Sequence, residues 1–392
     1  MFPALEGLRA FGALSVATAH SWPSLVRDLA WFNGSFAVVE MFFVMSGFLV
    51  TRAYAHRVHG LQDVAGFATK RLGRLYPLHL AVLLAWVAIF YAKQGLNLGL
   101  TMAGIDLGMT PVADQAPFEG VVFLLHLTML QGLGFTDSLA FNFPAWSISA
   151  EFAAFLLVMA VFALTSSGAS RIKVALLGLG LCTAHYVWAW LFTDSAPAIN
   201  EPLIARGITR SGAAYFIGVL GFEWQRRYRL SASAWQQGVI QALCLTCLLV
   251  LIPNQASIAL AQLWASGLWA VLIVSLCSGE GWLVRLFSRP SIVWLGQRSY
   301  ALYLTHALLL LLVQRRVARL DDDVLLNIAY VAYLVACVGL AALAHRYIER
   351  PGYEPFRRWA ARMAGNRPSS HATGQPAGQS HARLSRETAP LR

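Results

Sequence analysis

Long apolar segments separated by short polar ones follow one another along most of the chain. Runs of about 18 or more mostly apolar residues are typical of transmembrane helices. Two of the segments are short, and one of these, 118–134, is closely flanked by glycine and proline. The segments cover approximately residues 5–25, 36–54, 75–92, 118–134, 146–165, 172–193, 211–224, 234–252, 256–278, 296–314 and 324–347.

The distribution of lysine and arginine decides how segment 118–134 lies, because cytoplasmic loops carry an excess of these residues. If the N-terminus is cytoplasmic and this segment enters the membrane without crossing it, 23 of the 30 basic residues lie inside. If the segment crosses, only 11 do. The pattern predicts an all-α integral protein of the cell inner membrane. It has about ten transmembrane helices, one re-entrant segment and both termini in the cytoplasm.

Composition agrees with a membrane protein and divides the chain in two. The chain is 57% hydrophobic and only 12% charged, whereas a soluble domain is about one quarter charged. A net charge of +11 would suggest a nucleic-acid partner in a soluble protein, but the positive-inside pattern accounts for it here. We expect membrane lipid around the chain and no nucleic acid.

Residues 1–355 are expected to form the membrane-embedded domain, and 356–392 are expected to be a basic, disordered cytoplasmic tail.

Cysteine and histidine spacing gives no sign of a metal or redox centre. Cys244 and Cys247 form a CxxC pair, but they lie within an apolar segment, where small packing residues are the simpler interpretation. His56 and His59 stand three residues apart without a third ligand in the sequence. We therefore expect no metal site and no permanently bound cofactor.

Five ionisable residues inside the apolar segments mark a candidate site, because such groups are costly in a membrane unless they face a cavity or one another. Arg9 and His20 are eleven residues apart, so on one helix they point the same way, about 16 Å apart along the axis. Arg9 then lies near the cytoplasmic end. Counting from the outer ends of their helices places Glu40 and Glu151 at the depth of His20, with His306 nearby.

A histidine beside a carboxylate suits a general base that acts on a hydroxyl, because the carboxylate fixes the tautomer and raises the basicity of the ring. We expect His20 to be this base and Glu40 or Glu151 to orient it. The alternative interpretation is that His20 is structural, that Arg9 extends to the interface, and that the carboxylates only support helix packing.

The predicted inner loop 52–74 carries five basic residues. Arg71 and Arg74 share one face of a helix, and paired guanidinium groups bind phosphate well. The alternative is that these residues only set the topology. In the second segment, Ser46 and Gly47 allow either a close backbone approach or ordinary small-residue packing.

Six short motifs in order resemble those of the acyltransferase 3 family of membrane O-acyltransferases, over roughly residues 5–355. The family's basic residue, ten-residue spacer and histidine correspond to Arg9 and His20, and its RxxR segment corresponds to Arg71 and Arg74. The other motifs lie at 40–49, at 124–131 followed by 146–151, at 295–306 and at 349–351.

The resemblance implies acyl-CoA as co-substrate, a carbohydrate or glycolipid hydroxyl as acceptor, and His20 as the catalytic histidine. It also implies that Arg9, Arg71 and Arg74 serve donor binding or architecture. Many family members carry a further esterase-like domain that completes transfer. No such domain follows in this sequence, so direct transfer to the acceptor is expected.

Other motif residues extend this expectation or depart from it. Ser46, Trp146 and His306 are expected to contact substrate or to be structural. Phe152 stands where the family usually has a second glutamate, so a role for that carboxylate does not carry over. His126 stands where an asparagine is common.

The hypothesis is a membrane O-acyltransferase that moves an acyl group, expected to be acetyl, from cytoplasmic acyl-CoA to a hydroxyl of a cell-surface or lipid-linked carbohydrate. A transient acyl-histidine is a variant of this mechanism. Two other classes stay open. A multi-pass secondary transporter also keeps intramembrane histidine and glutamate, and it predicts ion-coupled uptake without thioester turnover. A non-enzymatic component of an assembly machine predicts that His20 is dispensable.

The topology can be tested with reporter fusions placed after Phe135 and after Ser195. Because segment 118–134 is expected not to cross, both fusions should report the outer side of the membrane. Reports from opposite sides would show that the segment crosses.

Overall fold

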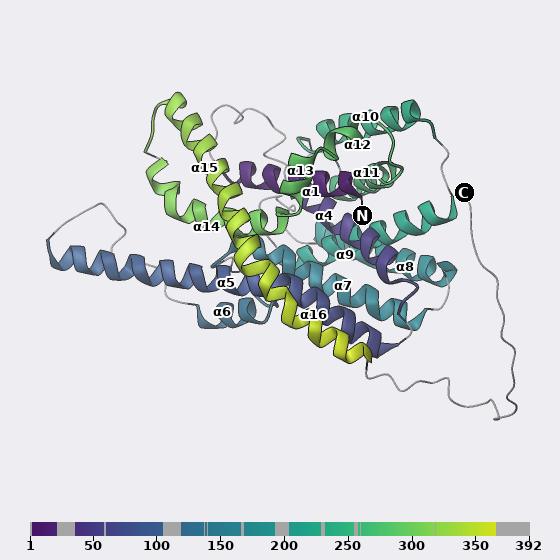
Figure 1. The fold of residues 1–392 in the computed structure, drawn as a ribbon, viewed down its shortest axis with the longest axis horizontal. Coiled ribbons are helices and arrows are strands. Elements are labelled where there is room, and N and C mark those ends of the chain that lie inside the picture. The colour runs from purple at the N-terminus through teal and green to yellow at the C-terminus, as the bar shows by residue number, and fades with distance from the viewer. Residues whose placement is uncertain are drawn as a thin grey trace, which may run out of the picture.

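The structure is a computed structural model, and within the residues it describes every regular element is helical (Figure 1). It describes residues 2–21, 36–58, 60–104, 119–136, 138, 140–165, 168–192, 204–228, 232–254, 258, 260–317 and 319–365. The α-helices are α1 (Pro3–Ala19), α4 (Phe36–Tyr54), α5 (Leu61–Met102), α6 (Gly120–Leu127), α7 (Trp146–Leu164), α8 (Gly168–Phe192), α9 (Ile204–Arg227), α10 (Ala234–Leu251), α11 (Ala261–Leu276), α12 (Trp282–Phe287), α13 (Pro290–Gly296), α14 (Ser299–Val317), α15 (Asp323–Ala344) and α16 (Arg350–Gly365). A 3₁₀ turn, Phe143–Ala145, precedes α7, and a π turn, His345–Glu349, joins α15 to α16.

Five of the helical segments in the described part of the chain are long and apolar enough to cross a membrane. They are Ala37–Tyr54, Leu61–Leu100, Phe143–Leu164, Ala234–Leu251 and Asp323–Met363. Other predicted spans are too short to be counted among these, because α1 has 17 residues and α11 has 16, whereas at least 18 are required. The chain is therefore an all-helical membrane protein, and the number of about ten crossings stays a prediction.

The segment 118–134, which the distribution of basic residues predicts to be re-entrant, contains a short helix, α6. The eight residues of α6 extend about 12 Å, which is too short for a hydrocarbon core of about 30 Å. Two side chains of α5 donate hydrogen bonds to the carbonyls at its end: Tyr76 to Leu127 at 2.9 Å and His79 to His126 at 2.7 Å. These bonds satisfy carbonyls that a helix end leaves without an intrahelical partner.

After α6 the chain folds back against the first turns of α7. Gln131 donates to the carbonyl of Ala145 at 2.9 Å, and the Gly132 amide donates to the Ser149 hydroxyl at 3.1 Å. Ser149 in turn donates to the carbonyl of Met129 at 2.7 Å. These polar groups are buried, so α7 begins inside the protein rather than at its surface.

Helices α4 and α9 pack closely because both carry glycine where they meet. A Cβ at Gly47 would collide with the backbone of Tyr215, and one at Gly218 with the backbone of Val44. Of the two alternatives left open for Ser46 and Gly47, the structure shows the close backbone approach, at Gly47. Trp269 of α11 is fully buried beside them and donates from Nε1 to the carbonyl of Ala37 at 2.9 Å.

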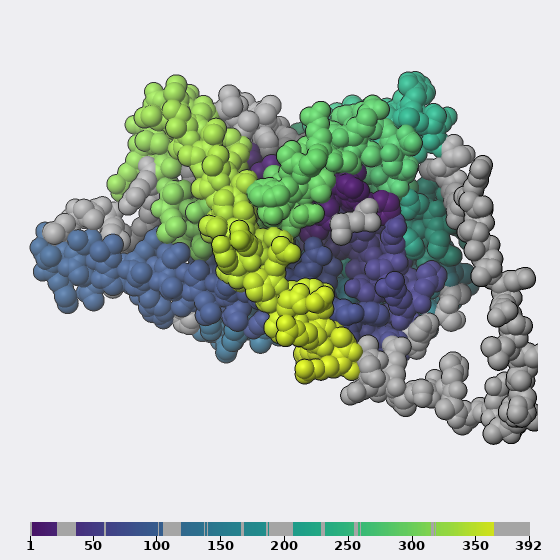
Figure 2. Space-filling view, in the orientation of Figure 1, coloured from purple at the N-terminus to yellow at the C-terminus, as the bar shows by residue number. Residues whose placement is uncertain are grey.

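The start of the predicted C-terminal tail needs a correction. Residues 356–365 are not a disordered tail, because they belong to α16, which packs along α5 in the opposite direction. Figure 2 shows α16 in yellow lying across this face of the molecule, next to the blue α5. Its residues are polar on average but strongly amphipathic, and Phe356 packs on Gly73. The average composition of the segment did not reveal this apolar face of the helix. Residues 366–392 lie outside the described residues.

The α4–α9 contact predicts that Gly47→Ala and Gly218→Ala each destabilise the fold. The added methyl would meet backbone atoms, which cannot move aside, and overpacking of this kind costs about 1–3 kcal/mol. Gly221→Ala on the same helix is the matched control, because its nearest neighbour would be 3.7 Å away. Thermal unfolding of the purified variants in detergent measures the difference. Equal melting temperatures for Gly218→Ala and Gly221→Ala would contradict close packing.

Candidate active site

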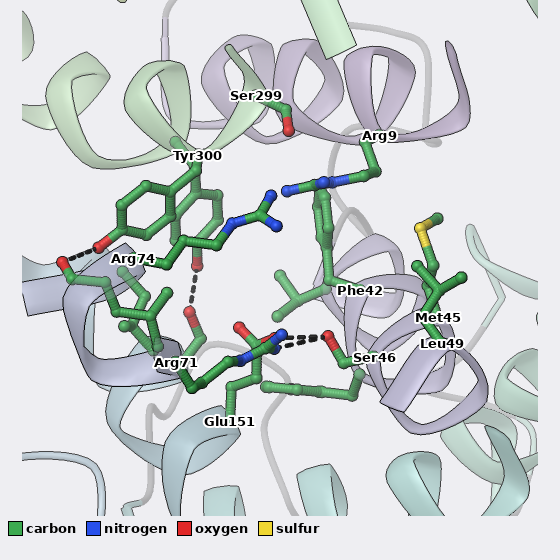
Figure 3. Close-up of a pocket in the computed structure, with 16 residues that line it drawn as sticks. Arg9, Phe42, Met45, Ser46, Leu49, Arg71, Arg74, Glu151, Ser299 and Tyr300 are labelled. Carbon is green, nitrogen blue, oxygen red and sulfur yellow. Dashed lines mark hydrogen bonds and ion pairs between the residues drawn. The ribbon is translucent and has the colours of Figure 1, made fainter. Parts of the chain in front are cut away.

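Helices α1, α4, α5, α7 and α14 surround a pocket into which three arginines project (Figure 3). The other lining residues are mostly apolar or hydroxylated. The lining consists of Arg9, Val39, Phe42, Phe43, Met45, Ser46, Leu49, Arg71, Arg74, Leu75, Ser147, Ile148, Glu151, Ser299, Tyr300 and Tyr303. The three arginines predicted to bind the donor, from two distant parts of the sequence, thus line one pocket.

Arg71 is held in place on the pocket wall. It makes an ion pair with Glu151, and both groups also contact the Ser46 hydroxyl. Its guanidinium lies over the ring of Phe155, 5.5 Å from the centroid. Its Nε atom is buried without a hydrogen-bond partner, so Arg71 retains a donor after pairing with the carboxylate.

Arg9 and Arg74 point toward each other across the pocket (Figure 3). Arg9 is paired only loosely with Glu6, at 3.5 Å. The side chain of Arg74 is exposed, and the structure gives it no carboxylate partner in the described part of the chain. Two guanidinium groups that face each other repel, and an anion between them would relieve that repulsion. The Ser299 hydroxyl is also buried at this pocket without a partner.

The spacing of the RxxR segment is explained by the helix that packs behind it. Gly73 lies between the two arginines, on the opposite side of α5, where Phe356 of α16 leaves no room for a side chain. One turn further along α5, Gly352 of α16 meets Pro77 in the same way. Helix α16 thus supports the turn of α5 from which Arg71 and Arg74 reach the pocket.

His20 directly follows α1, eleven residues after Arg9, and contacts a second histidine. Its Nδ1 lies 3.0 Å from Nε2 of His306, and the two rings are nearly parallel. His306 is fully buried, and its Nδ1 lies 2.7 Å from the carbonyl oxygen of Tyr303. The ring of Phe143 packs edge-on against both imidazoles.

This geometry fixes the tautomers of the pair. A carbonyl oxygen can only accept, so the Nδ1 of His306 carries a proton and donates it to Tyr303. In the neutral ring, Nε2 of His306 is then an acceptor. The contact at 3.0 Å therefore requires that Nδ1 of His20 is the donor. It follows that Nε2 of His20 carries a lone pair, as a general base needs.

Aromatic side chains stand between the arginine pocket and the histidine pair. Tyr303 lines the pocket, and its ring centroid is 6.0 Å from that of His306. Its hydroxyl is held by the Ser147 hydroxyl at 2.8 Å and by the carbonyl of Pro144 at 3.2 Å. Phe42 packs edge-on against Tyr303, with the centroids 6.1 Å apart. Tyr303 thus contacts both the lining of the arginine pocket and His306.

The two carboxylates expected beside His20 lie elsewhere. His20 contacts His306, whereas Glu40 pairs with Arg210 and Glu151 with Arg71. For Glu151 the expected place beside His20 was wrong, because the start of α7 packs against residues 129–132 inside the protein and Glu151 faces Arg71. For Glu40 the estimate missed the arginine that α9 supplies at the same depth.

Sequence reasoning also gave no role to three residues in and around the site, Arg210, Tyr303 and Ser147. Arg210 neutralises the fully buried Glu40, and its guanidinium lies 6.0 Å from the ring centroid of Trp146. Trp146 also contacts Phe43, which places it in the packing around the site rather than in the pocket. Tyr303 and Ser147 lie within the motifs at 295–306 and 146–151, but no role was expected of either. The available signal for Arg210 was its position directly before the apolar segment 211–224.

No grouping of three His, Cys, Asp or Glu side chains suitable for a metal ion occurs among the described residues. Cys244 is buried and Cys247 is exposed, on the same helix.

Comparison with known proteins gives relatives that share most of this chain. It is 27% identical over 387 residues to the putative peptidoglycan O-acetyltransferase YrhL of Bacillus subtilis, covering 91% of this chain and 56% of that protein. It is 23% identical over 370 residues to the peptidoglycan O-acetyltransferase OatA of Listeria monocytogenes, covering 89% and 55%. A third relative, protein 2 in the picA locus of Rhizobium radiobacter, is 31% identical over 163 residues, covering 41% and 81%. The chain thus spans about half the length of the two acetyltransferases.

No solved structure matches the chain. The family described as an acyltransferase domain matches residues 2–346, which include all the arginines and both histidines of the site. The chain therefore belongs to the acyltransferase 3 family.

Proposed function

We propose that the chain transfers an acetyl group from cytoplasmic acetyl-CoA to a hydroxyl of a cell-surface or lipid-linked carbohydrate, in the cell inner membrane with both termini inside. The observation that carries the proposal is the arrangement along α1. Arg9, in the first half of the helix, and two further arginines line one pocket, and a histidine with a fixed tautomer lies at the end of the helix, eleven residues further on. One helix thus links an anion site to a base.

The arginines suit the phosphates of coenzyme A. Arg9 and Arg74 face each other without a shared counter-ion (Figure 3), and phosphate oxygens accept charge-assisted hydrogen bonds from guanidinium groups. Both residues lie at the end predicted to be cytoplasmic, where acetyl-CoA would enter. The thioester arm would then extend along the apolar part of the pocket toward Tyr303.

The aromatic side chains beside His306 favour a short acyl group. Tyr303 packs on Phe42 and contacts His306, and the hydrogen bonds of its hydroxyl hold its ring in place. An acetyl group has only two carbon atoms and needs less room beside this fixed ring than a longer chain. The names of the two long relatives, both O-acetyltransferases, point to the same acyl group.

The reaction needs two proton transfers, one to Nε2 of His20 and one from it. Nε2 of His20 takes the proton of the acceptor hydroxyl while the oxygen attacks the thioester carbonyl. The C–S bond then breaks, the ester is released, and the coenzyme A thiolate takes the proton from Nε2. Throughout the reaction, Nδ1 of His306 keeps its proton and donates a hydrogen bond to the Tyr303 carbonyl. His306 also holds the ring of His20, so it acts as a positioning residue.

Arg74→Ala tests donor binding most directly, because Arg74 has no protein carboxylate to leave unpaired among the described residues. Losing hydrogen bonds to a charged group costs about 1.5–3 kcal/mol, so acetyl-CoA affinity should fall about tenfold or more. Arg74→Lys should recover only part of this. Isothermal titration of purified protein with acetyl-CoA measures the loss.

Arg57→Ala is the matched control, since Arg57 is exposed and basic and precedes α5 at the same end of the protein. It should leave affinity unchanged. Equal affinities for wild type, Arg57→Ala and Arg74→Ala would mean that the arginines only set topology.

His20→Gln tests the base. Glutamine keeps hydrogen-bonding capacity but cannot take the proton, so turnover should fall about 10²–10⁴-fold with acetyl-CoA binding nearly intact. His306→Ala should lower kcat by less than this and leave the KM for acetyl-CoA unchanged, because it frees the ring of His20 without removing the base. Acetyl transfer by variants matched for folded amount separates the two roles. Substantial turnover in His20→Gln would remove His20 from the mechanism.

A further inference from the structure

A second cavity lies among the ends of α4, α9, α10 and α11 and shares no lining residue with the arginine pocket. The apolar residues that line it come from the interior turns of α9, α10 and α11. The lining consists of Phe2, Arg52, Ile217, Leu220, Gly221, Phe222, Trp224, Gln225, Arg226, Tyr228, Gln237, Ile240, Ala270, Val271, Val274, Ser275, Cys277 and Ser278.

The polar groups of this cavity gather at one end of the helices. Helices α4 and α9 run in the same direction, because Glu40 near the start of α4 pairs with Arg210 near the start of α9. Arg52 and Arg226 therefore both lie at the far ends of these helices. Ser278, just after α11, and Gln237, in the first turn of α10, also line this end.

The apolar part extends inward from that polar end. On α9 the lining runs from Arg226 to Ile217, and nine residues of helix correspond to about 14 Å. That depth is close to half of a hydrocarbon core of about 30 Å. The cavity thus has the polarity and depth of one leaflet of the membrane.

The polar end carries an excess of positive charge. Arg52 has no carboxylate partner in the described part of the chain, and its guanidinium stacks on Phe2 at 4.1 Å. Arg226 shares the fully buried Glu223 with Arg171, so one carboxylate faces two guanidinium groups. None of the cavity's lining residues is acidic.

Two aromatic side chains mark this end as a membrane interface. Trp224 and Tyr228 line the cavity and are 43% and 54% exposed. Tryptophan and tyrosine with this partial exposure are enriched at the level of lipid head groups. The adjacent arginines are then at the height of lipid phosphates.

We propose that this cavity binds an anionic glycerophospholipid of the inner leaflet. Its phosphate would lie between Arg52 and Arg226, and its acyl chains would run along Leu220 of α9 and Val271 of α11. A soluble phosphate compound matches the charge of the site but leaves the apolar depth of the cavity uncovered. The occupant is therefore a lipid, and its binding stabilises the folded protein by an amount that rises with the logarithm of the lipid concentration relative to Kd.

The test is titration of the purified, delipidated full chain in detergent with phosphatidylglycerol, followed by native mass spectrometry and thermal unfolding. Phosphatidylglycerol should bind at least about tenfold more tightly than phosphatidylcholine and should raise the melting temperature. Arg52→Gln should lose most of this preference, and Arg52→Gln combined with Arg226→Gln should lose all of it. Arg319→Gln, an exposed arginine in the α14–α15 connection, is the matched control and should bind as wild type does.

Three results would overturn the proposal. One is equal binding of the two lipids by wild type, and another is unchanged phosphatidylglycerol binding in Arg52→Gln. Arg52 makes no ion pair in the described structure, so that variant should fold, and unfolding of the lipid-free protein verifies it. The third is equal stabilisation by inorganic phosphate or glycerol phosphate, which would show that the site takes a free anion.

Discussion

The site depends on one constraint: a buried backbone segment that forms no helix must satisfy its polar groups inside the protein. The segment after α6 meets this constraint by bonding to the first turns of α7. This contact places the start of α7 in the interior. Glu151, one turn along α7, therefore reaches Arg71 rather than His20. The pocket exists because a short segment folds back.

A second constraint acts on the opposite wall. Glu40 is fully buried, and a buried carboxylate without a partner would cost several kcal/mol. Arg210 of α9 supplies the partner, and the glycines at the α4–α9 contact let the two helices approach closely enough for it to do so. These interactions fix α4, from which Phe42 and Ser46 face the pocket. The ion pair thus serves the architecture of the site from outside the pocket.

Much of the site could be predicted because it lies along single helices. The spacing of Arg9 and His20 gives their common face directly, and the three-residue spacing of Arg71 and Arg74 does the same on α5. Partners on different helices could not be predicted in this way. The contact between His20 and His306 depends on how α1 and α14 pack, and that depends on many side chains at once.

The error over Glu151 has the same origin. Counting residues from a helix end measures depth only if every helix starts at the membrane surface, and nothing in the local sequence of α7 says that it does not. The helical part of the tail was missed for a different reason. Average composition describes a disordered segment well, but it does not show that the apolar residues of α16, such as Phe356, Ala360 and Met363, are placed to pack on α5.

The hydrogen bonds that run from His20 through His306 stop at the backbone carbonyl of Tyr303. This arrangement bears on whether protons can cross the membrane through the site. The Tyr303 carbonyl accepts a hydrogen bond from His306 but cannot take up its proton. A proton that arrives on His20 therefore has no onward path through His306 and must leave by the nitrogen at which it entered. An acyl group could pass between the two faces of the membrane while the proton gradient across it is left intact.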